Sequence, residues 1–146
     1  REWNHDSSLD WHLLDYQLHR GLNQLVRDLN FLYRREKALY EQQFVSEGYE
    51  WIDGSDRSNC ALTFMRKDVA GDYLIVVLNF TPVVRTPYRI GVPEEGTYEE
   101  IFNSDRHAYG GSGVLNEGDL TAEYFHYQWK DYSLQITLPP LGMVVL

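Results

Sequence analysis

The sequence predicts a mainly β protein, an antiparallel β-sandwich preceded by a helical segment at the amino-terminal end. Three observations carry this prediction. After Gly48, short runs rich in β-branched and aromatic residues follow one another, separated by Gly, Pro, Asn and Asp. Before Gly48, one long stretch has apolar residues at helical spacing. Residues 74–78 are apolar at consecutive positions, which is typical of a central strand buried on both faces.

The amino-terminal helix is expected over residues 18–33. At a helical turn of 100° per residue, its apolar side chains fall within about 120° of one another. They are Leu18, Leu22, Leu25, Val26, Leu29, Leu32 and Tyr33. Each such side chain contributes roughly 1.5–3 kcal/mol when fully buried, so this stripe must pack on another surface. Phe31 points about 140° away from the edge of the stripe, which predicts a second cover behind the helix, with a single exposed aromatic as the alternative.

The pattern changes between residues 44 and 49, which predicts the only boundary in the chain. The segment "EKALYEQ" continues the helical part and is expected to end near Gly48. The sequence therefore divides into a helical part, residues 1–45, and a β part, residues 46–146.

Seven strands are expected in the β part, and they are 49–52, 60–67, 73–80, 87–92, 97–103, 132–138 and 143–146. Residues 133–138 alternate between apolar and polar, so this strand should have one solvated face. In "AEYFHYQWKDY", an extended backbone would place Phe125, Tyr127 and Trp129 on one face. We interpret that row as core or interface packing, with a sugar-binding platform as the alternative.

Charge and cysteine content exclude several classes of function. The 146 residues carry a net charge of -9 without a basic cluster, so nucleic acid and anionic membranes are not expected partners. The single cysteine, Cys60, expected within a strand, forms no internal disulfide and no multi-cysteine metal site, which favours a reducing cytoplasm. The start at Arg1 lacks a targeting pattern and is interpreted as a break in a longer chain.

The sequence predicts neither a metal site nor a catalytic group. His5, His12 and His19 recur every seven residues, which on a helix separates neighbouring rings by about 10 Å, too far for one ion. Adjacent acidic residues, Glu94–Glu95 and Glu99–Glu100, would point to opposite faces of a strand. The Gly-rich segment 103–118 matches no phosphate-binding motif and is interpreted as a functional or interface loop.

The segment "EWNHDSSLDW" combines flat aromatic rings with hydrogen-bonding side chains. Such a mixture suits sugars, because their C–H faces pack on the rings while their hydroxyls bond to Asn and Asp. The alternative is that Trp3 and Trp11 pack into a core and that Asp6, Ser7 or Asp10 caps a short turn.

Taken in order, eight segments resemble the C-terminal portion of bacterial glycogen branching enzymes, which belong to the α-amylase superfamily (glycoside hydrolase family 13). The segments are "REWNHDSSLDWHLL", "GLNQLVRDLNFLYR", "ALYEQQF", "GYEWID", "LNFTP", "YRIGVP", "NSDRHAYGGSG" and "SLQITLPPLG". Family members often carry a His-Gly turn before "SL"; this chain has "QWKDYSL", so no role of that turn is transferred.

The resemblance implies that residues 1–45 are the last loop and closing helices of a (β/α)₈ catalytic barrel, and that residues 46–146 are the C-terminal all-β domain. It implies an enzyme that moves an α-1,4-glucan segment onto a 6-hydroxyl to make an α-1,6 branch, without a cofactor. The catalytic carboxylates of the family lie upstream, so no catalytic residue is assigned and this chain alone is expected to be inactive. The barrel's last loop belongs at the substrate-binding mouth.

The site residues predicted from this loop are Trp3, Asn4, Asp10 and Trp11, as contacts to substrate. The expected partners are an α-glucan, as glycogen or a maltooligosaccharide, and the missing barrel of the same polypeptide. Self-association through the exposed helix face is the alternative cover for the apolar stripe. Two other functions are weighed: a free-standing carbohydrate-binding module, and a purely structural domain.

Overall fold

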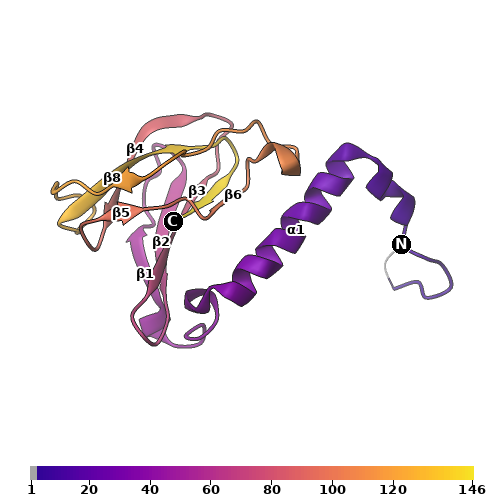
Figure 1. Cartoon of the computed structure of the whole chain (residues 1–146), viewed down its shortest axis with the longest axis horizontal. Coiled ribbons are helices and arrows are strands. Elements are labelled where there is room, and N and C mark those ends of the chain that lie inside the picture. The colour runs from indigo at the N-terminus through magenta and orange to yellow at the C-terminus, as the bar shows by residue number, and fades with distance from the viewer. Residues whose placement is uncertain (1–2) are drawn as a thin grey trace.

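A computed structural model describes residues 3–146, so the expected break at Arg1 lies outside the described residues. One long helix leads into a β-sandwich (Figure 1). The helical elements are η1 (Trp11–Asp15), α1 (Gln17–Arg35), η2 (Lys37–Leu39), η3 (Ser46–Gly48) and η4 (His107–Tyr109). The strands are β1 (Tyr49–Asp53), β2 (Ala61–Lys67), β3 (Tyr73–Asn79), β4 (Arg85–Val92), β5 (Thr97–Tyr98), β6 (Phe102–Asn103), β7 (Leu120–Thr121), β8 (Tyr132–Leu138) and β9 (Met143–Val145).

Antiparallel pairing organises the strands into one large sheet and two strand pairs. The large sheet has the order β1-β2-β3-β9-β6, and the pairs are β4-β8 and β5-β7. The core between these layers is built from apolar side chains on their facing sides, among them Met65, Ile75, Val77, Ile90, Leu134, Leu138 and Val144. This arrangement confirms the expected mainly β, antiparallel fold.

Strand β3 is the central strand that the consecutive apolar run predicted. Ile75 and Val77 point into the sandwich core, whereas Leu74 and Val76 point to the opposite face of the large sheet. Helix α1 covers that second face, so every one of these four side chains is buried. Strand β8 also follows its pattern, because Leu134 and Leu138 are buried while Gln135 is exposed.

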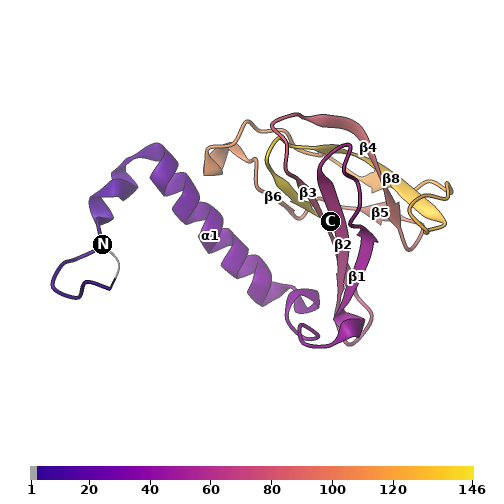
Figure 2. The ribbon, with the colours of Figure 1, turned by 180° about the vertical axis from the view of Figure 1, so that it is seen from behind.

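Helix α1 confirms the predicted helix, but its apolar stripe is divided. Leu25, Leu29 and Leu32 pack against the large sheet with Val76, Phe102 and Val145. The other edge faces solvent: Leu18, Leu22, Val26 and Tyr33 are between 44% and 70% exposed. Figures 1 and 2 show the helix running diagonally away from the sandwich toward its amino-terminal end.

Phe31 is 56% exposed in this chain, and the Arg27 guanidinium lies over its ring, 5.7 Å from the ring centre. The second cover expected behind the helix therefore stays a prediction. Two other local expectations need correction. Cys60 is not in a strand but in the exposed turn before β2, with φ of 48°. Residues after η2 form turns rather than a longer helix.

The aromatic row 125–129 does not form a strand and does not pack into the core of the described residues, whereas interface packing stays a prediction. Tyr127 and Lys130 exchange two backbone hydrogen bonds of 3.0 Å around a two-residue turn. Both central residues, Gln128 and Trp129, have positive φ, as in a type I′ turn. Trp129 points into solvent instead of a core, with 92% of its surface exposed. Within residues 3–146, no helix combines the length and the apolar character needed to cross a bilayer.

Candidate functional site

The four predicted substrate contacts lie in the segment before α1, beyond the sandwich (Figure 1). Trp3 and Trp11 are 93% and 61% exposed, so neither packs into a core of this chain. Asn4 folds back on its own segment, where its Oδ1 accepts a hydrogen bond from the Asp6 backbone N–H at 3.0 Å. Asp10 stands at the start of η1, but its side chain makes no capping bond.

Trp3 and Trp11 therefore keep their ring faces exposed, and the Asp10 side chain makes no capping bond. Neither tryptophan packs into a core formed by residues 3–146, and packing against another part of the polypeptide remains the alternative. A role in substrate binding stays a prediction.

The bare edge of α1 is an exposed apolar surface that begins next to this segment. Leu18, Leu22 and Val26 line it, and Tyr16 precedes it with 62% of its surface exposed. If each of the four stripe residues on this edge is about half exposed, then covering them would add roughly 3–6 kcal/mol of hydrophobic stabilisation. Exposed apolar surface of this extent is typical of an interaction face.

The Gly-rich segment 103–118 holds α1 against the sandwich. The Tyr109 hydroxyl donates a hydrogen bond to the Asp28 carboxylate at 2.8 Å, and the Tyr109 ring stacks on Phe102. Gly21 lets the helix approach closely, because a Cβ there would lie 2.6 Å from the Tyr109 carbonyl oxygen. The interface-loop interpretation thus applies within the chain itself.

Charge reinforces this contact between helix and loop. Hydrogen bonds from the Gln24 amide and from Tyr109 hold the pKa of Asp28 below its ordinary value. Burial, together with the bond to Asp28, raises the pKa of Tyr109 to about 12. Around neutral pH, Asp28 therefore stays ionised and accepts the bond, and Tyr109 stays protonated and donates it.

Asp105 organises the loop from inside. Its carboxylate accepts bonds from the Ser112 backbone N–H and hydroxyl, at 2.8 and 2.7 Å, and from the Val114 N–H at 2.9 Å. Burial opposes ionisation, but these bonds prevail and hold the pKa of Asp105 below its ordinary value. These hydrogen bonds fix the conformation of the loop around the Asp105 carboxylate.

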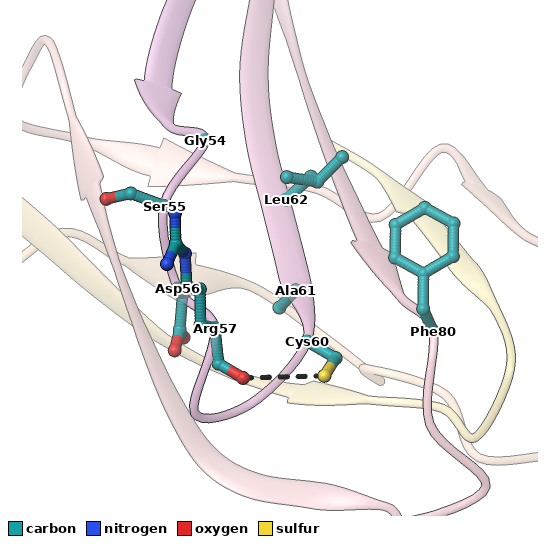
Figure 3. Close-up of a pocket in the computed structure, with 8 residues that line it drawn as sticks. All are labelled: Gly54, Ser55, Asp56, Arg57, Cys60, Ala61, Leu62 and Phe80. Atoms are coloured by element: carbon teal, nitrogen blue, oxygen red, sulfur yellow. Dashed lines mark hydrogen bonds between the residues drawn. The ribbon is translucent and has the colours of Figure 1, made fainter.

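A shallow pocket of about 310 Å³ opens at the end of the sandwich beside β2 (Figure 3). The Cys60 thiol donates to the Arg57 carbonyl oxygen at 3.4 Å rather than facing a base. Asp56 accepts bonds from the Asn59 amide and the Tyr88 hydroxyl, which against burial keep its pKa low. Ser55 also lines the pocket, and Asp53 Oδ1 accepts bonds from its backbone N–H at 2.8 Å and its hydroxyl at 3.1 Å, so this carboxylate forms a local turn.

Residues 3–146 contain no group of three or more His, Cys, Asp or Glu side chains arranged to hold a metal ion. His5 pairs with its neighbour Asp6 at 3.3 Å, with both side chains in solvent.

Sequence reasoning missed one aromatic cluster on the outer face of β1 and β2. Tyr49 stacks on Phe64, and Trp51 meets both rings edge-on, with ring centres 5.2–6.0 Å apart. Tyr49 and Trp51 are two residues apart in β1, so their side chains lie on the same face, and Trp51 pairs with Phe64 of β2. The spacing of "YEW" was the signal for a shared face.

Comparison with known proteins defines the class first. Residues 51–146 match the family described as Alpha amylase, C-terminal all-beta domain, and the chain belongs to that family. This agrees with the described sandwich, which begins at β1.

The full chain is further similar to particular enzymes. It is 49% identical over 147 residues to the 1,4-alpha-glucan branching enzyme GlgB of Aquifex aeolicus, covering 100% of this chain and 23% of that protein. It is 52% identical over 144 residues to the GlgB of Cereibacter sphaeroides, covering 99% of this chain and 20% of that protein. The resemblance to branching enzymes is confirmed, and the chain spans about a fifth of these relatives' length.

Proposed function

We propose that this chain is the carboxy-terminal part of a glucan branching enzyme, in which the sandwich buttresses a catalytic barrel closed by α1. The observation that carries the proposal is the divided stripe of α1. One edge packs on the large sheet and the other is bare, in a chain about half identical to branching enzymes. Residues 1–45 would then complete the barrel, and residues 46–146 would support it.

The bare edge favours this function over a free-standing carbohydrate-binding module. A module that works alone gains nothing from a helix with four apolar side chains in water. A barrel of the same polypeptide would cover this edge and recover the roughly 3–6 kcal/mol of burial. A second copy of the chain is the competing cover, which sedimentation at increasing concentration would reveal.

Four acidic side chains of this chain are unsuited to act as the protonated acid. Retaining transfer between glucans needs one carboxylate as nucleophile and one protonated acid with a raised pKa across the scissile bond. Here, hydrogen bonds keep the pKa low for Asp28, Glu50, Asp56 and Asp105. Because the chain spans about a fifth of the length of its relatives, we place the cleavage and transfer steps on barrel residues outside residues 1–146.

The segment before α1 is proposed as the glucan-contacting part of the chain. Trp3 and Trp11 present free ring faces, and Asn4 and Asp10 present polar groups beside them. In the complete enzyme, this segment would stand at the barrel mouth, where such barrels bind substrate. The substrate is an α-glucan such as glycogen or a maltooligosaccharide, and the cytoplasm is the proposed location.

The experiment compares the complete polypeptide with residues 1–146 alone, using amylose as the acceptor and donor. The complete polypeptide should form α-1,6 branches, detected by debranching and chain-length analysis. Residues 1–146 should form none. Branching by the short chain, or its absence in the folded complete polypeptide, would refute the proposal.

A further inference from the structure

The turn after β7 displays aromatic rings on a rigid support, at the end of the sandwich farthest from α1 in both views (Figures 1 and 2). Tyr124 and Trp129 are 83% and 92% exposed, and half of Phe125 is exposed beside them. We call the surface formed by Tyr124, Phe125 and Trp129, with His126 and Asp131, the hairpin face.

The backbone beneath the hairpin face is fixed by contacts to two strands, β1 and β4. The Gln128 side chain accepts a bond from the Gly91 N–H and donates one to Asp53, both at 2.9 Å. Lys130 pairs with Glu50. The hairpin lies so close to β4 that a Cβ on Gly91 would sit 2.4 Å from the Tyr127 carbonyl oxygen.

Two of the three rings, those of Phe125 and Tyr124, are also held in place. The Arg89 guanidinium lies 4.5 Å from the centre of the Phe125 ring and is itself bound to Glu123 at 2.8 Å. The Tyr124 ring meets Tyr132 edge-on, with centres 5.5 Å apart. Rigid rings lose little conformational entropy on binding, so they suit a ligand that offers only weak individual contacts.

Trp129 occupies a backbone position that favours glycine. Its φ of 64° lies in the left-handed region, which disfavours a side chain with a Cβ. No packing compensates this strain, because the ring is in solvent. Strain that is retained without a folding benefit is typical of a functional position.

We propose that the hairpin face is a second binding surface for a linear α-1,4-glucan chain, which packs its sugar rings on Trp129 and Tyr124. Flat rings beside hydrogen-bonding groups match pyranose chemistry, and His126 and Asp131, 3.6 Å apart and both exposed, supply those groups. The proposal rests on the proposed function, since the named activity of the relatives is on 1,4-alpha-glucan. The surface would hold a long glucan away from the segment before α1.

The test titrates maltoheptaose into the ¹⁵N-labelled 146-residue chain and follows the four tryptophan indole N–H resonances. The Trp129 resonance should shift and saturate. Trp129→Gly removes the ring and relieves the backbone, so the variant should fold at least as well while its association constant falls about fivefold. Tyr124→Ala should weaken binding similarly, whereas Phe44→Ala, which removes an equally exposed aromatic ring elsewhere, should have no effect.

An unmoved Trp129 resonance, or equal affinity in Trp129→Gly and the parent, overturns the proposal. So does concentration-dependent self-association that Trp129→Gly abolishes, because the occupant is then a second copy of the chain. Branching by the complete polypeptide is measured separately. Active branching without binding at the hairpin face refutes only this inference, and binding there without branching refutes only the proposed function.

Discussion

Gly21→Ala tests whether α1 is held on the sandwich by close backbone contact with the segment 103–118. In an exposed helix, this change stabilises a protein by about 1 kcal/mol. Here the new Cβ would lie 2.6 Å from the carbonyl oxygen of Tyr109 and 2.7 Å from its carbonyl carbon. Both atoms are backbone, so the loop must move away from the helix.

The movement has a cost that exceeds the gain in helix propensity. Overpacking costs about 1–3 kcal/mol, and separation of Tyr109 from the Asp28 carboxylate adds about 1.5 kcal/mol. We expect a net loss near 2 kcal/mol, or roughly 1 M in the urea midpoint for a domain of this size.

Urea unfolding followed by circular dichroism measures this loss. Asn30→Ala is the matched control, because Asn30 is an exposed position of the same helix and gains only propensity. If Gly21→Ala raises the midpoint as Asn30→Ala does, then the close contact between α1 and Tyr109 is refuted.

Three further predictions concern charge and the site. Lys130 and Lys67 lower the pKa of Glu50, so the stabilisation by the Glu50 carboxylate is present above its unfolded pKa and is lost as pH falls through the folded pKa. Glu50→Gln should therefore lower the urea midpoint at pH 7, and the difference from the parent should shrink as the pH is lowered below the unfolded pKa; a difference that does not change with pH would contradict this. Asp105→Asn should lose about 2 kcal/mol in the same assay, since an amide cannot accept all three bonds; an unchanged midpoint would contradict this. In the complete polypeptide, Trp11→Ala should raise the KM for amylose about fivefold with kcat nearly constant, and an unchanged KM would remove Trp11 from the site.

The elements with a strong period were predictable from sequence. Helix α1 was predictable from apolar residues at a spacing of 3.6, and β3 from five consecutive apolar residues. In both cases the pattern lies within the element itself, so a single segment of the sequence was enough to predict it. The sequence did not show which edge of α1 the sandwich covers. That depends on Tyr109, which lies 81 positions from Asp28 along the chain.

The hairpin face shows why the extended backbone expected for Phe125 to Trp129 was wrong. Alternating aromatics from Phe125 to Trp129 satisfy a strand pattern, but a two-residue turn with left-handed Gln128 and Trp129 interrupts it. No glycine marks this turn, because side-chain bonds from Gln128 hold a conformation that local propensity disfavours. Among the predicted site residues, exposure of Trp3 and Trp11 follows from structure alone, since the sequence equally allowed core packing.

The central claim is that another part of the same polypeptide covers the bare edge of α1, and thiol labelling at Val26→Cys tests it most directly. Val26 is half exposed in residues 1–146. Peptide mass spectrometry would compare the labelling rate at this position in the 146-residue chain and in the complete polypeptide, each relative to its denatured rate. The account predicts labelling at least about tenfold slower in the complete polypeptide, since a covered thiol must wait for local opening. Equal rates in the two proteins would contradict it.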